Sequence, residues 1–214
     1  MKRKKSKRSK LSTALFLERF SLFAGATLVA LAGIAWVDGF AHSRSAVAEF
    51  DRIKEMAVAS TDQLTWSERR KTEYQRALSE EAGPTLSVLR IASTGMEVPV
   101  FDSTSKTALN RGAGHIAGTA LPGTPGNIAI AGHRDGFFRP LKDISVGAQI
   151  ELTTLQGQQT FRVAELMIVD PLDVSVLDPT DETIITLITC YPFYFVGAAP
   201  QRFIVRATLL KPSD

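Results

Sequence analysis

From Leu86 onward, the chain repeats short runs of β-branched and apolar residues that are separated by Gly, Pro and Asn. Such runs are typical of strands joined by tight turns. The predicted strands are Leu86–Ile91, Glu97–Val100, Asn127–Ala131, Gln149–Thr153, Thr160–Val169, Thr183–Thr189 and Arg202–Leu209. Long helices do not alternate with these runs, which disfavours a parallel α/β sheet. The pattern therefore predicts an all-β fold, either a closed β-barrel or a β-sandwich.

A basic run and an apolar stretch precede the β-rich part. Residues 1–19 contain eight Lys or Arg and one acidic residue, and the 18 residues from Phe20 to Val37 contain no charge. As a helix, this stretch would be about 27 Å long, close to the thickness of a bilayer's hydrocarbon core. Basic flanks stay cytoplasmic, so the residues that follow would be extracytoplasmic. The sequence predicts a single-pass transmembrane helix that is not cleaved.

A cleavable signal peptide is the alternative, with Ala46-Val47-Ala48 as a loose cleavage site. The apolar stretch is longer than the usual h-region of roughly 7–15 residues, which favours the anchor. The chain then divides into four parts: a cytoplasmic tail (1–19), the transmembrane anchor (20–37), a stalk with an N-terminal helix (38–83) and the β-barrel domain (84–214).

The N-terminal helix is predicted to begin at a capping box, Thr65-Trp66-Ser67-Glu68, and to stop at Gly83-Pro84. A sparse apolar stripe should pack onto the body, and it consists of Trp66, Tyr74 and Leu78. The charged residues expected on the solvated faces are Arg69, Arg70, Glu73 and Arg76.

Charge and cysteine content exclude several classes of protein. From Asp38 onward the chain has 17 basic and 21 acidic residues, and this acidic balance argues against nucleic-acid binding. Cys190 is the only cysteine, which excludes an intrachain disulfide and a Cys-rich zinc or iron–sulfur site. Three histidines leave little scope for a His cluster. We therefore expect no metal and no cofactor.

Cys190 is a candidate nucleophile because it follows a run of β-branched and apolar residues, Thr186-Leu187-Ile188-Thr189, and Pro192 soon ends the strand. A nucleophile needs a rigid platform behind it and an open cleft in front. In an oxidising exterior, an unpaired cysteine suggests a reactive thiol or an intermolecular bond. The alternative is a small buried hydrophobe.

His133 and Arg202 are candidate partners of this thiol. His133 ends the run Ile130-Ala131-Gly132, and an imidazole suits proton transfer near neutral pH. Arg202 precedes an apolar strand, and its fork of donors can stabilise an oxyanion or hold a peptide carbonyl. The alternative for His133 is a structural histidine. The alternative for Arg202 is a surface ion pair, and the same alternative applies to Arg206.

Taken together, the order of these motifs resembles the sortase family of membrane-anchored cysteine transpeptidases. Cys190 follows His133 by 57 residues and precedes Arg202 by 12. The resemblance runs from about Trp66 to Ala207, and the Cys-Tyr-Pro-Phe of residues 190–193 is most similar to class D and related class E sortases. Further matching motifs are Gly114-His115-Ile116, Thr119-Ala120-Leu121-Pro122-Gly123, Gly126-Asn127 and Leu141-Lys142-Asp143-Ile144 before Gly147.

The resemblance implies a closed eight-stranded β-barrel with short helices, and a role for each residue of the set. Cys190 would be the nucleophile, His133 the general acid/base and Arg202 the stabiliser of the oxyanion and substrate. Such enzymes cleave a C-terminal Leu-Pro-x-Thr-type sorting signal, hold the acyl part as a thioester and pass it to an amine of the cell envelope, typically on a peptidoglycan precursor. The expected partners are therefore a protein substrate bearing this signal, that amine and the membrane.

Four further residues are candidates for substrate contacts: Thr189, His115, Phe193 and Tyr194. His115 is either structural or lines the substrate site, and the aromatic run from Phe193 lines the groove or packs in the core. Asp135 either orients His133 or caps a turn.

Some sortases bind calcium with acidic loops, and this chain has an acidic loop before the Cys190 strand, formed by Asp170, Asp173, Asp178, Asp181 and Glu182. Pro171 and Pro179 make turn formation the simpler interpretation, so no metal is assigned.

Two other functions compete with transpeptidation. One is a cysteine endopeptidase that hydrolyses its thioester, and the other is a non-catalytic, membrane-tethered barrel that binds a peptide or a wall component.

Overall fold

A computed structural model of the chain describes residues 27–29, 48, 50–57, 63–64, 66–194 and 198–210. The chain divides into two units, residues 1–47 and 48–214, and only the helical residues 27–29 are described in the first. The predicted tail and almost all of the predicted transmembrane helix therefore lie outside the described residues. Among the described residues, no helical segment has the length and apolar character of a membrane span.

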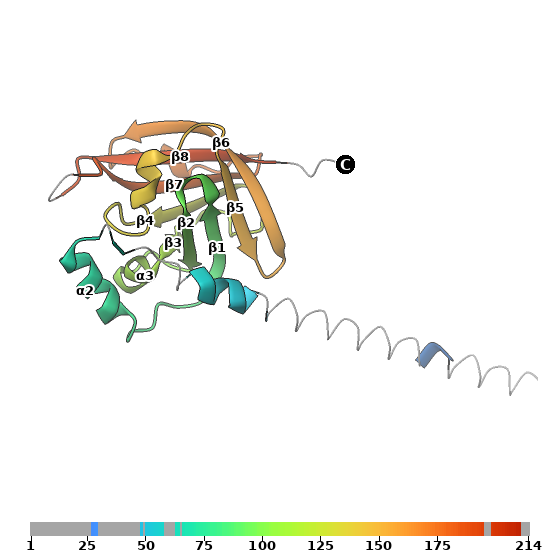
Figure 1. Ribbon diagram of the computed structural model, residues 1–214. Helices are drawn as coiled ribbons and strands as arrows, with labels where there is room; N and C mark the ends of the chain where they lie inside the picture. The colour runs from blue at the N-terminus through green and yellow to red at the C-terminus, as the bar shows by residue number, and fades with distance from the viewer. Residues whose placement is uncertain are drawn as a thin grey trace, which may run out of the picture. The chain divides into compact units, whose positions relative to one another are not determined.

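The second unit is built on a closed barrel with the strand order β1-β2-β3-β4-β7-β8-β6-β5 (Figure 1). The strands are β1 (Thr85–Ile91), β2 (Met96–Phe101), β3 (Ala113–His115), β4 (Asn127–Gly132), β5 (Gln149–Thr154), β6 (Gly157–Val169), β7 (Ile184–Tyr191) and β8 (Gln201–Leu209). The short 3-10 helices are η1 (Ala92–Thr94), η2 (Arg139–Asp143) and η3 (Ser175–Leu177). The predicted all-β barrel of eight strands is thus confirmed.

All seven strands predicted from the sequence are present, and their ends differ by no more than three residues. The pattern missed β3, which has only three residues and too short a run to show alternation. β3 pairs parallel with β2 and antiparallel with β4, so it closes the gap between these two strands.

β4 and β7 form the second parallel pair of the barrel and position the site. Five of the six residues of β4 are buried, which fits a strand with an almost uninterrupted apolar sequence. The barrel interior is filled by large buried side chains, among them Ile130, Phe138, Leu141, Phe161 and Leu187.

The helices α2 (Glu68–Ala77) and α3 (Lys106–Arg111) lie together at one end of the barrel (Figure 1). The predicted cap is corrected: Thr65 lies outside the described residues, and Ser67 is the N-cap, its Oγ accepting from the backbone N–H of Arg70 at 3.2 Å. α2 also ends at Ala77, well before Gly83-Pro84, and Leu78 is its exposed C-cap rather than part of a buried stripe.

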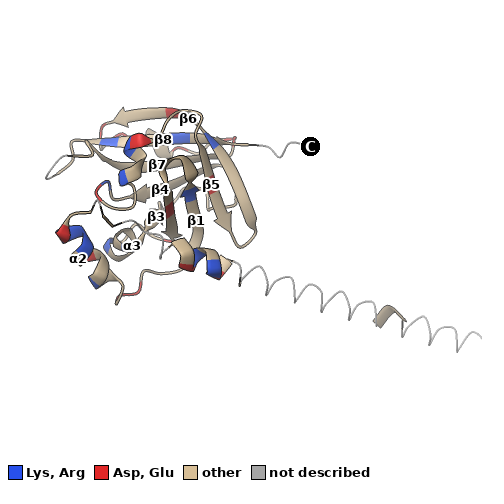
Figure 2. Cartoon of the chain, in the orientation of Figure 1, with Lys and Arg blue, Asp and Glu red and all other residues tan. Residues whose placement is uncertain are grey.

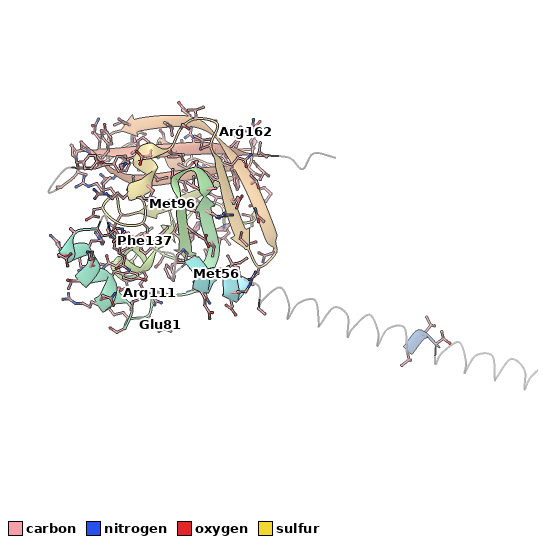
Figure 3. The ribbon with its side chains drawn as sticks, in the orientation of Figure 1. Met56, Glu81, Met96, Arg111, Phe137 and Arg162 are labelled. Carbon is pink, nitrogen blue, oxygen red and sulfur yellow. The ribbon has the colours of Figure 1, made fainter. Side chains whose placement is uncertain are left out.

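Trp66 packs onto the body as predicted. Its ring lies 4.9 Å from Phe137 and 5.6 Å from Tyr74, centroid to centroid, in edge-to-face contacts. Figure 3 labels Phe137 on the side of the barrel that faces α2. These aromatic contacts attach α2 to the turn that follows β4.

Candidate active site

Cys190 lies near the carboxyl end of β7, between two neighbouring strands. β7 pairs with β4 on one side, as far as Thr189, and with β8 on the other side, including Cys190. Backbone hydrogen bonds therefore hold β7 from both sides up to the residue before the cysteine. The cysteine is half-buried and unpaired. This is the rigid platform that the sequence predicted for a nucleophile.

His133 is the first residue after β4. Because β4 and β7 are parallel and Gly132 is in register with Thr189, their carboxyl ends meet at one edge of the barrel. Thr189 Oγ1 donates to the Gly132 carbonyl at 2.8 Å, which fixes this register. A Cβ on Gly132 would lie 2.5 Å from Cγ of Phe138, so only glycine fits where the chain turns.

Cys190 and His133 line the same open cleft, which has a volume of about 790 Å³. A cleft of this size accommodates a segment of peptide. Its other lining residues are Ser67, Arg69, Arg70, Arg134, Asp135, Arg139, Phe193 and Tyr194. The structure thus brings together the predicted nucleophile and the predicted acid/base, which lie far apart in the sequence.

Arg202 is the cross-strand partner of Cys190 on β8. Its Nη1 donates to the backbone carbonyls of Gln201, at 3.1 Å, and Ala199, at 3.4 Å. It is not among the residues that line the cleft. The backbone of Arg202 is therefore beside the thiol, while its guanidinium contacts the loop before β8.

The environment of His133 favours the neutral imidazole. The pKa of His133 is lowered to about 4, chiefly by burial and then by the positive charge of Arg70, while Asp135 and Glu73 act in the opposite direction. At neutral pH the ring is therefore uncharged and can accept a proton from a thiol.

The other predicted contact residues divide between cleft and core. Phe193 and Tyr194 line the cleft; Tyr194 is 72% exposed, and the Arg139 guanidinium lies 5.5 Å from its ring centroid. Phe193 also packs against Phe203 at 5.3 Å, so both interpretations of the aromatic run apply to it. Thr189 is buried and bonded to Gly132, as described above.

His115 is 4% exposed on β3 and is not among the residues that line the cleft. Its Nε2 lies 3.0 Å from the Ala120 carbonyl and 3.1 Å from Thr119 Oγ1. These contacts hold the loop after β3 and favour the structural interpretation of this histidine.

In the acidic loop, Asp170 and Asp173 accept hydrogen bonds from nearby residues of the same turn. Asp170 Oδ1 accepts from Leu172 N at 2.8 Å, and Asp173 Oδ1 accepts from Ser175 N and Oγ at 3.1 and 2.6 Å. The Ser175 hydrogen bonds lower the pKa of the Asp173 carboxyl. These bonds are those of ordinary aspartate turns, as the turn interpretation of the loop expects.

The sequence interpretation missed two arginines. Arg70 was expected on a solvated face, but it is 7% exposed and lines the cleft. Its position midway between Trp66 and Tyr74, at spacings of four residues, was a signal that it shares their buried face. Arg134 donates from Nη1 to the Pro192 carbonyl at 3.0 Å and so connects the turn that carries His133 to the segment that follows β7.

Comparisons with known proteins agree with this architecture. Residues 89–210 match the sortase domain family. Sortase D of Bacillus subtilis (strain 168) is 28% identical over 191 residues, covering 87% of this chain and 93% of that protein. A Clostridium perfringens Sortase D5 transpeptidase has a similar structure, with a TM-score of 0.57, 26% identity, and coverage of 75% of this chain and 99% of that one. For Listeria monocytogenes sortase A the TM-score is 0.55 and the identity 29%, with 59% of this chain and 88% of that one covered.

A matched family domain, a closed eight-stranded barrel and a cysteine and histidine in one cleft point to the same conclusion: the chain belongs to the sortase family of cysteine transpeptidases.

Proposed function

We propose that this protein cleaves a Leu-Pro-x-Thr-like sorting signal through a Cys190 thioester and transfers the acyl group to an amine of the cell envelope. The observation that carries the proposal is the shared cleft of Cys190 and His133 at the ends of two parallel strands. The match to the sortase domain supports the reaction class.

In the first half-reaction, the Cys190 sulfur attacks the carbonyl carbon of the signal's threonine. His133, neutral at pH 7, takes the thiol proton. Arg202 stabilises the negative charge on the carbonyl oxygen once its guanidinium turns from the Ala199 and Gln201 carbonyls toward the thiol. The C–N bond breaks, the departing amine takes the proton from His133, and a thioester remains.

In the second half-reaction, the amine of the acceptor attacks the thioester carbonyl. His133 accepts a proton from this amine, the C–S bond breaks, and the proton returns to the Cys190 sulfur. The products are a new amide bond and the free enzyme. Thiol, imidazole and guanidinium supply all of the chemistry in this scheme, and we assign no cofactor.

We also propose that the protein is a single-pass membrane protein with a cytoplasmic N-terminus and an extracytoplasmic catalytic domain. The support is the charge-free stretch from Phe20 to Val37 behind a basic run. The acceptor would then be an amine on a peptidoglycan precursor. Membrane fractionation followed by protease treatment of intact cells tests this topology: recovery of the full-length protein in the soluble cytoplasmic fraction would overturn it.

The similarity to Sortase D of Bacillus subtilis supports a class D-like assignment. The sequence motif Cys-Tyr-Pro-Phe at residues 190–193 supports the same assignment.

The decisive experiment uses the purified full chain with a peptide that contains Leu-Pro-x-Thr, with and without an added amine. We expect mass spectrometry to detect an acyl-enzyme that disappears in Cys190→Ala, and a transfer product that appears only when the amine is present. Hydrolysis at equal rates with and without amine would identify an endopeptidase. A Cys190 thiol that does not react with a small electrophile would identify a non-catalytic binding protein.

A further inference from the structure

We propose that Arg70 is a positioning residue: its buried guanidinium holds Asp135, and through Asp135 the turn that carries His133. The inference rests on the proposed function, in which His133 moves the proton. Arg70 belongs to α2, which lies before the matched sortase domain, so the match to the family does not assign it a role.

The guanidinium of Arg70 connects three separate segments. Nη2 donates to Asp135 Oδ1 at 2.9 Å, and Nη1 donates to Asn110 Oδ1 on α3 at 2.7 Å. Nη1 also lies 3.3 Å from Glu73 Oε2, one turn along α2. A nearly buried cation needs such partners, because an unpaired charge is costly to remove from water.

The aliphatic part of Arg70 packs against the same turn. The ideal Cβ position of Gly136 lies 3.4 Å from Arg70 Cδ and 3.7 Å from His133 Cβ, so little space separates these side chains. Within the turn, the His133 carbonyl accepts from the backbone N–H groups of Gly136 and Phe138, each at 3.1 Å. Phe137 then packs between Trp66 and Tyr74. The α2 segment therefore holds the turn through several contacts. The contact made by Arg70 is the ion pair with Asp135.

Arginine suits this role better than lysine. Its planar fork donates to Asn110 and Asp135 at once and so fixes the distance between α3 and the turn. An ammonium group supplies the charge but not this fixed geometry. Small displacements of a catalytic group can cost roughly 10²-fold in rate.

Arg70 also acts on the titration of His133. The charged groups that affect the imidazole are Arg70 and Glu73 from α2 and Asp135 from the turn. Arg70 lowers the pKa of His133, whereas Asp135 and Glu73 raise it. Removing Arg70 should therefore raise the pKa, and removing the Asp135 charge should lower it.

The test compares Arg70→Gln, Arg70→Lys and Asp135→Asn in the full chain, with Arg76→Gln as the matched control on an exposed part of α2. Two quantities are measured: kcat for acyl transfer, and the titration midpoint of the His133 imidazole by NMR, with its resonance assigned from its absence in His133→Ala. Circular dichroism and the rate of Cys190 alkylation show whether the barrel is intact.

We expect Arg70→Gln to lower kcat roughly 10²-fold and to raise the His133 midpoint, with alkylation unchanged. Arg70→Lys should keep the midpoint near that of the wild type but lower kcat, and Asp135→Asn should lower kcat and shift the midpoint downward. Arg76→Gln should change neither quantity.

A normal kcat together with an unmoved midpoint in Arg70→Gln would overturn the proposal. If Arg70→Gln does not fold, Asp135→Asn tests the same ion pair from a side chain that is 47% exposed, and a wild-type kcat there would also overturn it. If the wild type transfers no acyl group to any amine, the proposed function fails, whereas the midpoints still show whether Arg70 acts on His133.

Discussion

The two residues at the centre of the cleft are held by different parts of the molecule. Cys190 lies within β7, which pairs with β4 as far as Thr189 and with β8 through Cys190 itself. His133 lies one residue beyond β4, in a turn that contacts Arg70 and the aromatic side chains of the α2 segment. The thiol is thus placed by the barrel, and the imidazole by the helices beside it.

Charged side chains gather at the cleft that both residues line. Figure 2 shows Lys and Arg along α2, and four arginines with one aspartate line the cleft. This comparison teaches that changes in α2 should reach the imidazole and leave the thiol unaffected. The predictions below test that separation, from the largest expected effect to the smallest.

The largest effect should come from the barrel side. We expect Cys190→Ala to abolish acyl-enzyme formation, because no other cysteine exists to replace the nucleophile. The fold should persist, since a small apolar side chain replaces the half-buried thiol. Mass spectrometry after incubation with the peptide and circular dichroism measure the two properties. Residual turnover by the purified variant would show that Cys190 is not the nucleophile.

His133→Gln should lower the rate of acylation by about 10²–10⁴-fold, the usual contribution of general acid/base catalysis. The matched variant is His115→Gln, which should lower stability more than rate because His115 is buried against Thr119 and Ala120. Single-turnover acylation and thermal unfolding are measured for both. Equal losses in the chemical step would contradict the assignment of His133.

Arg202→Lys should lower acylation by about 10²–10³-fold although the charge is kept, because a lysine lacks the planar fork of donors. Arg206 is four residues along β8, about 13 Å away at ~3.3 Å per residue, and is in register with Thr186 rather than with Cys190. Arg206→Lys should therefore acylate normally. If Arg202→Lys acylates at the wild-type rate while Arg206→Lys acylates slowly, the oxyanion is stabilised by Arg206 instead.

The lowered pKa of His133 predicts a pH-dependent stability. The folded state binds this proton near pH 4 and the unfolded state near 6.5, so the unfolded state takes up more protons between these values. The free energy of unfolding should fall as the pH drops through this window and level off below it. After allowance for partial exposure we expect roughly 2 kcal/mol from this group.

Urea unfolding of wild type and His133→Gln at pH 7 and pH 4 isolates this contribution, because the other titrating groups are common to both proteins. The fall in stability should be smaller in His133→Gln. An identical fall in both proteins would show that burial does not perturb the imidazole.

The smallest effect should come from the end of α2. Ser67→Ala removes the N-cap and should cost about 1 kcal/mol of stability, with the rate of Cys190 alkylation unchanged. Ser79→Ala is the control beyond the other end of the helix, where the hydroxyl donates to the Arg76 carbonyl in an exposed position. A slower alkylation in Ser67→Ala would contradict the separation between helix and thiol.

Most of the barrel could be predicted from the sequence. Runs such as Asn127–Ala131 and Thr183–Thr189 are apolar and β-branched along nearly their whole length, so local composition determines both the strand and the residue at its end. Cys190 and His133 could be found for the same reason, since each ends such a run. β3 could not be found, because three residues show no period and its pairing is set by the neighbours β2 and β4.

The amino-acid pattern by itself thus determined the barrel strands, the thiol and the imidazole, because these depend on residues adjacent in the chain. Only the tertiary structure decided that Arg70 is buried. A charged residue on a surface helix is expected in water, but Asn110 and Asp135, 40 and 65 residues away, provide the acceptors that replace water. The charge of Arg70, placed by those distant partners, then adds to burial in lowering the pKa of His133.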